Sequence, residues 1–216
     1  MLLAAFARAF QPGDGIGLVI KDMGSTSFYR GQTAEAQVAE LRDRGYPIDY
    51  LDRSLSEAEL AGLYAACDGL VHPFRSEGFA LPVVEAMACG LPVIVTGAGP
   101  ALDYASDATA FLIPAHRGQF AECRVREFET IGRPWLFEPD QDALVEHLRR
   151  VAADPASARA KGAAASAWIR EHFTWTRAAG AVERRLHALI AEEIEPRMDT
   201  DEHRLEERPF LIFRDP

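Results

Sequence analysis

The stretch GLVHPFRSEGFALPVVEAMACGLPVIVT, from Gly69 to Thr96, decides the fold. It begins and ends on short apolar runs that are typical of strands, GLVHPF and PVIVT. Between them, Pro82 suits the first turn of a helix, and Gly90 suits the residue just past its end. The stretch therefore predicts a strand, a loop, a helix and a second strand.

The same alternation continues on both sides of this unit. Further strands are predicted at 16–21, 47–51 and 109–115, and helices at 2–10, 32–45, 57–67, 139–155, 156–173 and 174–190. Ser56 and Glu59 form the sequence pattern of a capping box at the start of one helix. Continuous apolar strands separated by about a dozen helical residues indicate buried parallel strands with helices on both faces. The predicted fold class is α/β, with a doubly wound parallel sheet.

Two segments depart from this pattern. Residues 118–134 are mixed in character and are expected to form a long irregular excursion. We expect residues 1–190 to form one domain and residues 191–216 to form a charged tail or linker. The run RPFLIF, at 208–213, is a candidate for an isolated strand near the end of the chain.

Composition narrows the class of protein. The chain has 216 residues and a formal net charge of −10, which argues against a nucleic-acid partner because such proteins usually display a basic face. Its three cysteines show neither a disulfide framework nor a zinc-site spacing. No apolar run approaches the roughly 18 residues of a membrane span, and the first residues do not read as a signal peptide. A reduced, cytoplasmic protein without a transmembrane segment is the simplest interpretation.

The loop between the two quoted strands offers a site for an anion. In doubly wound sheets, ligands bind beyond the carboxyl ends of the strands, and this loop lies there. Gly78 is expected to free the backbone after the strand, so that several amides point toward one place. A helix N-terminus with free amides attracts a phosphate. The amides expected to converge are those of Phe79, Ala80, Leu81 and Val83.

Glu77 and Glu85 flank this predicted anion site. Two carboxylates would repel a phosphate unless they bind a neutral group beside it, such as the adjacent hydroxyls of a ribose or a sugar ring. This combination favours a nucleotide sugar. The simpler alternative also stands at this point: the helix dipole favours any acid near a first turn, where Glu85 is expected, and Glu77 is then a solvated loop residue.

These residues resemble a known motif. SEGFALPVVEAMACGLPVIV is similar to the glutamate-x7-glutamate motif of the family 4 glycosyltransferases, which are retaining enzymes of the GT-B fold. LSEAELAGLYAACDGLVHPFRSEGFALP resembles the segment leading into that motif, and FEPDQDALVEHLRRVAADP with HFTW resembles the closing helices. The resemblance covers roughly residues 2–190. It implies the Rossmann-like, donor-binding domain that forms the C-terminal half of a GT-B enzyme.

The resemblance implies roles for individual residues. Glu85 would bind the ribose hydroxyls of the donor, and Glu77 would contact the transferred sugar beside the reacting carbon, as the catalytic residue. The backbone of Gly78, Phe79, Ala80 and Leu81 would hold the diphosphate. The family often has Gly where Ala80 stands, a departure that costs little if the backbone angle there is ordinary.

Basic side chains are also needed. A diphosphate carries about two negative charges, and a helix N-terminus offers only about half a unit in return. Lys21, at the end of its strand, and Arg75, two residues before Glu77, are the candidates. Arg53, between Asp52 and Ser54, is placed by the resemblance near the nucleobase, and His72 is expected to be a packed spacer. The family's own Arg and Lys lie just before the segment that LLAAFARAF resembles, so we expect the chain to start after them.

The leading hypothesis is the donor-binding half of a retaining glycosyltransferase, which moves a hexose from UDP or GDP to the hydroxyl of an unknown acceptor. A separate N-terminal acceptor domain is implied, and any membrane attachment would come through it. No metal or other cofactor is expected, and with half the cleft missing we do not expect turnover by this chain alone. Two alternatives remain open: a truncated, non-catalytic GT-B-like domain that acts as a nucleotide-binding or protein-interaction module, and half of a GT-B sugar-nucleotide epimerase.

Overall fold

The computed structural model describes residues 1–22, 34–125 and 128–194. For residues 192–194 it describes the backbone alone. The chain divides into a first unit, Met1–Thr174, and a second unit that begins at Trp175. Each unit is described by itself. The segment 208–213, a candidate strand in the sequence, lies outside the described residues.

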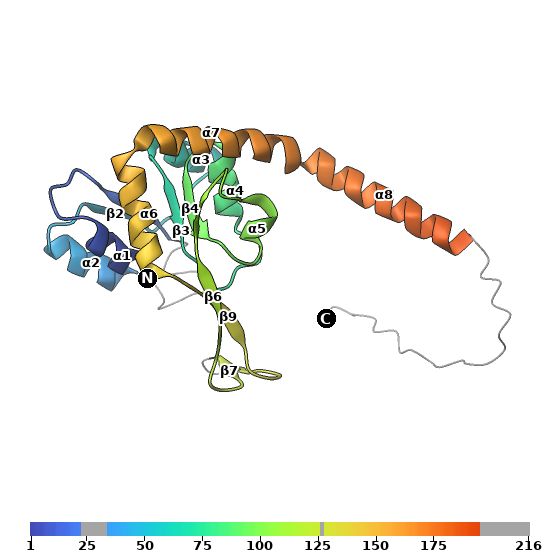
Figure 1. Ribbon diagram of the computed structural model, residues 1–216, viewed down its shortest axis with the longest axis horizontal. Coiled ribbons are helices and arrows are strands. Elements are labelled where there is room, and N and C mark those ends of the chain that lie inside the picture. Colours follow the sequence, from blue (N-terminus) through green and yellow to red (C-terminus); the bar gives the residue numbers. More distant parts are fainter. Residues whose placement is uncertain (23–33, 126–127, 195–216) are drawn as a thin grey trace. The chain divides into compact units, whose positions relative to one another are not determined.

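The first unit alternates strands and helices as predicted (Figure 1). Five strands and their helices fall within a few residues of the expected ranges, and the short helix α5 was not anticipated. In chain order the elements are α1 (Leu2–Ala9), β1 (Leu18–Lys21), α2 (Glu35–Asp43), β2 (Ile48–Leu51), α3 (Glu57–Ala66), β3 (Leu70–His72), α4 (Leu81–Ala88), β4 (Val93–Thr96), α5 (Ala101–Tyr104), β5 (Phe111–Ile113), α6 (Gln141–Ala153) and α7 (Pro155–His172).

The five strands pair in parallel, in two sheets. One sheet holds β1 and β2, with Leu18 opposite Ile48, and the other holds β3, β4 and β5 in that order. Within the described residues, β1 pairs only with β2, and β3 pairs only with β4. The expectation of uniformly buried strands holds for β4, all of which is buried, and is wrong for β1, where Val19 is 39% exposed. The reason is that Leu18 and Ile20 of β1 pack against an apolar core, whereas Val19, between them, belongs to neither core.

Apolar cores lie on both faces of the sheet around β4. Val93 and Val95 pack into one core, which α4 and α7 cover, while Ile94 packs into the other, which α1 and α6 cover. This alternation along one strand follows from the period of two in a β-strand. The doubly wound α/β arrangement is therefore confirmed (Figure 1).

Helix α7 fixes the end of α4 by a close backbone approach. A Cβ atom on Gly162 would lie 2.2 Å from the carbonyl oxygen of Gly90 and 2.9 Å from the nitrogen of Pro92. The hydroxyl of Ser166 donates to the carbonyl of Ala88 at 2.8 Å. The turn that ends α4 is thus held directly by α7, and this contact helps to position α4 on the sheet.

The capping box at the start of α3 is confirmed. The amide of Glu59 donates to the Ser56 hydroxyl at 3.3 Å, and the Ser56 amide donates to the Glu59 carboxylate at 2.8 Å. The hydrogen bond from the Ser56 amide, followed by that from its hydroxyl and by Arg53, lowers the pKa of Glu59 to about 2.

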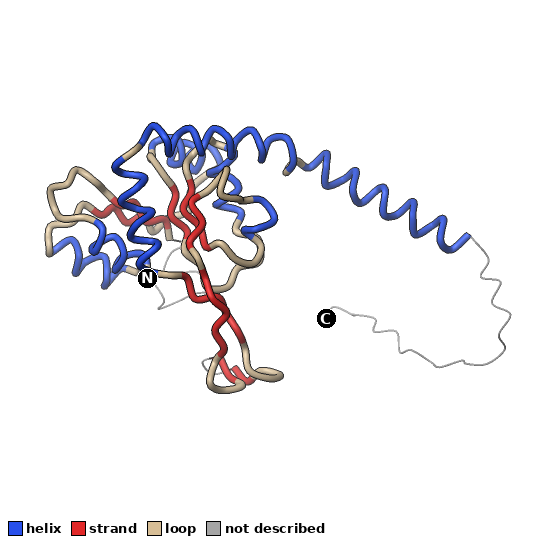
Figure 2. Tube along the Cα trace, viewed as in Figure 1, coloured by secondary structure: helices blue, strands red, loops and turns tan. Residues whose placement is uncertain are grey.

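The segment after β5 is more regular than expected. Residues 115–139, called the arm here, form an antiparallel ladder of β6 (Ala115–Gln119) with β9 (Trp135–Pro139), and a second one of β7 (Arg124–Val125) with β8 (Phe128–Glu129) (Figure 2). The expectation of an irregular excursion at 118–134 is wrong for these strands. Both faces of the arm meet solvent, as Phe128 and Trp135 show at 66% and 50% exposure, so no buried face marks the strands in the sequence.

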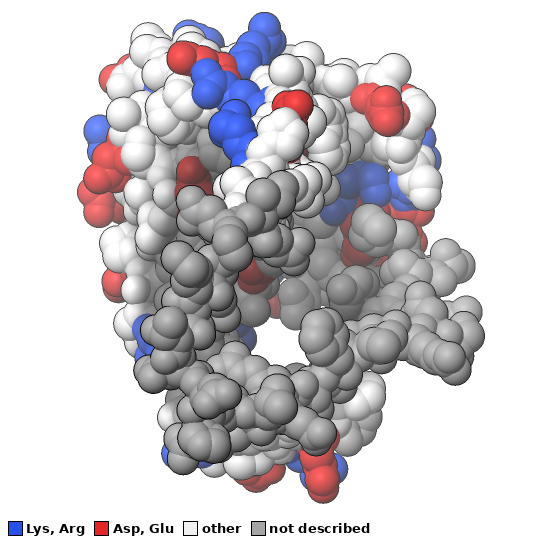
Figure 3. All heavy atoms as spheres, turned by 90° about the vertical axis from the view of Figure 1, so that its right-hand side faces the viewer, with Lys and Arg blue, Asp and Glu red and all other residues white. Residues whose placement is uncertain are grey.

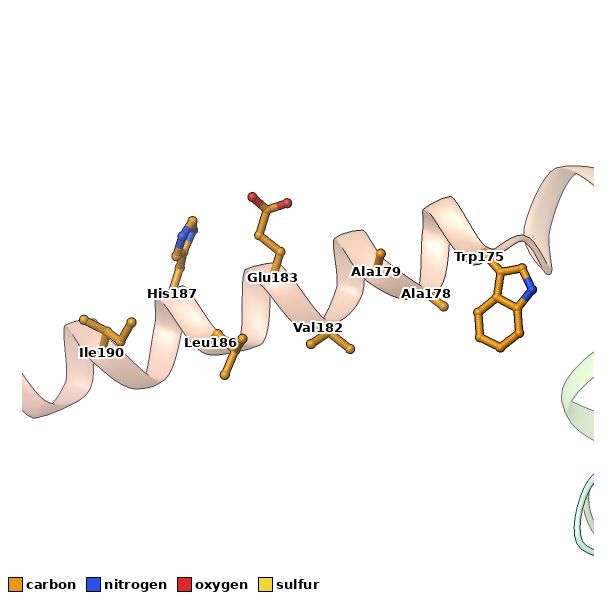
Figure 4. Close-up of a pocket in the computed structure, with 8 residues that line it drawn as sticks. All are labelled: Trp175, Ala178, Ala179, Val182, Glu183, Leu186, His187 and Ile190. Atoms are coloured by element: carbon orange, nitrogen blue, oxygen red, sulfur yellow. The ribbon is translucent and has the colours of Figure 1, made fainter.

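The second unit contains the helix α8 (Trp175–Ile194), which confirms the helix expected at 174–190 and continues it by four residues. Its apolar side chains gather on one side: Trp175, Val182 and Leu186 extend from that side, and Glu183 and His187 from the other (Figure 4). Among the described residues, no helix combines the length and the hydropathy needed to cross a bilayer. Acidic and basic side chains both occur on the face drawn in Figure 3.

Candidate donor-binding site

The loop that follows β3 begins at a fixed point. The amide of Phe74 donates to the Thr96 hydroxyl at 2.9 Å, and that hydroxyl donates back to the Phe74 carbonyl at 2.8 Å. Thr96 is fully buried at the carboxyl end of β4. The exit of β3 is therefore tied to its neighbour before the chain enters the candidate site at Ser76.

The N-terminus of α4 presents unbonded amides. Within the described residues, the amides of Phe79, Ala80 and Leu81 donate to no protein acceptor. The amide of Val83 donates to the Ala80 carbonyl at 2.9 Å, so the expectation that it also points to a ligand is wrong. Three adjacent amides at a helix N-terminus are still suited to phosphate oxygens.

The backbone constraint in this loop falls on Ala80. Its φ of +64° is left-handed, the only such angle at a non-glycine residue in the part of the chain described. The premise that the angle there is ordinary is therefore wrong, and an L-residue pays about 1–2 kcal/mol for it. Gly78, which we expected to free the backbone, has no left-handed angle, and a Cβ there would meet nothing within 4 Å. The position where glycine is favoured is thus two residues later than the sequence suggested.

Glu85 lies in the second turn of α4 and not, as expected, near the first, so the preference of acids for a first turn does not explain it. The hydroxyl of Tyr64, on α3, donates to its carboxylate at 3.1 Å. Burial, followed by the negative charge of Glu85, raises the pKa of Tyr64. Tyr64 thus holds one oxygen of Glu85 and leaves the other oxygen for a ligand.

Glu77 lies at the opposite end of the loop. One of its oxygens accepts from the amide of Gly78 at 2.9 Å. The other lies 3.6 Å from Nε2 of His72. The structure therefore places His72, which we expected to be only a packed spacer, directly beside the carboxylate that the resemblance assigns to the sugar.

The three basic candidates all have partners in the structure. Arg75 binds Glu138 of β9 through two nitrogen atoms, at 2.8 and 2.5 Å, and Arg53 binds Glu59 at 2.9 Å. The ammonium of Lys21 donates to the carbonyl of Asp22. Arg75 flanks the Glu77 loop, whereas Arg53 follows β2 and Lys21 ends β1. Arg75 is thus the basic candidate that lies closest in the chain to the free amides.

The arm is joined to this loop at its base. The amide of Phe137 donates to the carbonyl of Arg75 at 2.8 Å, beside the ion pair of Arg75 with Glu138. The ring of Phe137 also covers the turn after β4, where a Cβ on Gly99 would lie 3.3 Å from it. Gly99 has a φ of +59°, in the left-handed region that favours glycine.

The sequence interpretation missed three residues at the site: Tyr64, Glu138 and Tyr104, whose ring packs against that of Phe79 with centres 5.4 Å apart. Tyr64 reads as one apolar residue of a helix, 21 positions before Glu85, and Glu138 follows Arg75 by 63 positions. No local pattern connects residues at such separations. Within the described ranges, no cluster of three or more His, Cys, Asp or Glu side chains is placed to hold a metal ion.

Comparison with known proteins identifies the protein family to which the chain belongs. Residues 2–128, more than half of the chain, match the family model of the Glycosyl transferases group 1. The chain belongs to that family. This confirms the resemblance that the glutamate motif indicated.

Curated relatives match over parts of their length. The GDP-mannose-dependent alpha-(1-6)-phosphatidylinositol dimannoside mannosyltransferase of Mycobacterium tuberculosis is 28% identical over 150 residues, which are 69% of this chain and 32% of the relative. The O-antigen chain mannosyltransferase B of Escherichia coli is 41% identical over 70 residues, or 32% of this chain and 18% of that protein. The chain thus spans a third or less of these relatives.

Solved structures of GT-B glycosyltransferases share the fold. Sucrose-phosphate synthase from Thermosynechococcus elongatus aligns with a TM-score of 0.60 and 26% identity, over 88% of this chain and 42% of that one. Anabaena HepE in complex with UDP-glucose aligns with a TM-score of 0.56 and 19% identity, over 88% and 44%. The chain corresponds to less than half of each.

Proposed function

We propose that this chain is the donor-binding half of a retaining glycosyltransferase and that it holds a nucleotide diphosphate hexose at the N-terminus of α4. The observation that carries the proposal is the arrangement of this helix end. Three amides without a protein acceptor, of Phe79, Ala80 and Leu81, are flanked along the chain by two carboxylates, of Glu77 and Glu85. Amides at a helix N-terminus suit the diphosphate, and carboxylates suit hydroxyl groups on either side of it.

The proposed roles follow from the contacts. Glu85, with one oxygen held by Tyr64, accepts from the ribose hydroxyls with the other. Glu77 accepts from hydroxyls of the transferred sugar, and Arg75 joins the amides in neutralising the leaving diphosphate. Attack by the acceptor hydroxyl on the face from which the diphosphate leaves gives retention. The proposal assigns no metal ion to this chemistry.

The relatives support a UDP- or GDP-linked donor. HepE was solved with UDP-glucose and with UDP, and the name of the Mycobacterium tuberculosis relative specifies GDP-mannose. Because this chain spans less than half of the aligned structures, the proposal leaves the acceptor to residues outside it and places turnover in a larger assembly. A cytoplasmic location, inferred from the cysteine pattern, belongs to the proposal.

Calorimetry with UDP, GDP, UDP-glucose and GDP-mannose tests this function. We expect saturable binding of at least one nucleotide, weakened by Glu85→Gln for nucleotide and nucleotide sugar alike. Glu77→Gln should mainly weaken the extra affinity that the sugar adds. Absence of saturable binding by all four ligands, from a sample with a cooperative unfolding transition, would sink the proposal.

One observation favours a second candidate, the non-catalytic module. Arg75 and Arg53 are both paired with carboxylates, so the charge available for a diphosphate is smaller than the residue types suggest. A domain of this kind would keep the fold and act through contact with another chain. Folded protein without nucleotide affinity, in the same calorimetry, is the result that this candidate expects.

A further inference from the structure

Two polar atoms near Glu77 are buried and have no hydrogen-bond partner among the described residues. They are Nε2 of His72 and the hydroxyl of Tyr104. Nε2 of His72 lies 3.6 Å from a Glu77 oxygen, which is too long for a hydrogen bond. Most buried polar atoms in folded proteins are satisfied, so two unsatisfied ones near one carboxylate call for an explanation.

Tyr104 lies beneath the loop that carries Glu77. It ends α5, is 1% exposed, and packs edge-on against Phe79, with ring centres 5.4 Å apart. Phe173 closes the other side, with ring centres 6.2 Å apart. Burial first, and then the charge of Glu77, raises the pKa of Tyr104 to about 12, so the hydroxyl keeps its proton at neutral pH and can donate a hydrogen bond.

The loop itself is held in an unfavourable form. Ala80 adopts the left-handed angle, and Glu77 turns back to the amide of Gly78 instead of to His72 or Tyr104. An unsatisfied buried hydroxyl, an unsatisfied ring nitrogen and a left-handed alanine each cost free energy. A reorientation of the Glu77 carboxylate toward both groups would satisfy the first two together. Strain and unmet hydrogen bonds that gather at one loop are typical of a segment with two functional states.

We propose that Tyr104 and His72 are positioning residues that orient Glu77 when a nucleotide diphosphate binds. The inference rests on the proposed function. In the bound state, a phosphate oxygen takes the amide of Gly78 and thereby releases the Glu77 oxygen. The carboxylate then accepts from the Tyr104 hydroxyl and, in the tautomer protonated at Nε2, from His72. Held by these two donors, it presents its remaining lone pairs to the sugar hydroxyls.

Tyr104→Phe tests this arrangement because it removes only the hydroxyl. In the free protein the hydroxyl has no partner, so the urea midpoint should stay the same or rise. Affinity for UDP-glucose or GDP-mannose should fall about ten-fold. This loss of affinity should disappear when Glu77→Ala is already present, because Tyr104 acts through Glu77 and the two changes are not additive. It should persist when Glu85→Ala is present, because Tyr104 and Glu85 act independently and their effects add.

Tyr64→Phe is the matched control, because Tyr64 already donates to Glu85 in the free protein. Its effect should disappear in the Glu85→Ala background and persist in the Glu77→Ala background. The Tyr104 comparisons use the nucleotide sugar in every background, because UDP lacks the sugar that Glu77 contacts; UDP serves as the ligand for the Tyr64 comparisons.

These experiments distinguish a failure of the proposed function from a failure of the positioning roles alone. If wild type binds none of the nucleotides, the proposed function is overturned and this inference with it. If wild type binds, but Tyr104→Phe lowers the urea midpoint or has the same effect with and without Glu77, only the inference is overturned. A crystal structure of the UDP-glucose complex gives an answer without any variant: a Tyr104 hydroxyl still more than 3.5 Å from both Glu77 oxygens contradicts the proposal.

Discussion

Tyr64 on α3 donates a hydrogen bond to Glu85 on α4 at 3.1 Å, and so joins two helices at the carboxylate proposed to bind ribose. Removing the hydroxyl leaves the Glu85 side chain free to rotate. We expect Tyr64→Phe to weaken UDP and GDP binding roughly five-fold, equivalent to about 1 kcal/mol for one hydrogen bond. Calorimetry measures the loss.

Tyr46→Phe is the control for this change. The Tyr46 hydroxyl donates to backbone carbonyls of Ala7 and Phe10, away from the candidate site, so its loss should lower stability without changing nucleotide affinity. Equal affinities for wild type and Tyr64→Phe would show that Glu85 does not need this partner.

Arg75 is a candidate to bind phosphate, and its ion pair with Glu138 competes with that binding. Glu138→Gln keeps the shape of the side chain and removes the negative charge that competes with phosphate for Arg75. We expect it to tighten UDP binding roughly five-fold, because a partly exposed ion pair is worth about 1 kcal/mol or less. The gain should shrink with added salt and vanish when Arg75→Gln is combined with it. Weaker binding by Glu138→Gln would instead mean that the pair positions Arg75 for the ligand.

Two glycines in helices should respond in opposite directions to the same substitution. A Cβ at Gly162 would lie 2.2 Å from a backbone oxygen, and backbone cannot move aside as a side chain can. Gly162→Ala should therefore cost about 3 kcal/mol of unfolding free energy. Gly62, in α3, has open space within 4 Å of the point where a Cβ would lie, so Gly62→Ala should gain roughly 0.5–1 kcal/mol. Urea unfolding of the two variants compares them directly, and a stable Gly162→Ala protein would contradict the close approach of α7.

Stability should fall in alkaline solution. Burial raises the pKa of Tyr104 to about 12 and also raises that of Tyr64, whereas an unfolded tyrosine titrates near 10. Between pH 10 and 12 the unfolded chain therefore loses protons that the folded chain keeps, which favours unfolding. The stabilisation is present below pH 10 and is lost as the pH rises toward 12. Urea midpoints at pH 9 and 10.5 should differ less for Tyr104→Phe than for wild type.

Much of the fold could be predicted because it depends on local patterns. The apolar runs around Gly69–Thr96, the capping box at Ser56 and the turn at Gly90 each reflect the chemistry of a few neighbouring residues. The arm could not be predicted, because its strands have no buried face and its pairing joins residues up to 24 positions apart, as Ala115 and Pro139 show.

The candidate site was predictable only in part, for a similar reason. The helix N-terminus and the two glutamates lie within ten residues of one another and form a recognisable motif. Tyr64, the partner of Glu85, comes from α3, and Glu138, the partner of Arg75, comes from β9; the fold brings both to the loop. The residue type did not mark the left-handed angle at Ala80, because alanine is not typical of such an angle; the only hint was the glycine that the resembled family often has at this position.

The edges that β1 and β3 leave unpaired within the described residues affect how the protein behaves at the bench. On β1, the side chain of the apolar residue Val19 is 39% exposed. Such an edge is a template onto which another copy can add a strand, and a net charge of −10 opposes the approach of that copy. Salt screens that repulsion. Dilute, low-salt buffer should therefore keep the protein monodisperse, while concentration in high salt should make it scatter light, a difference that Val19→Lys should reduce.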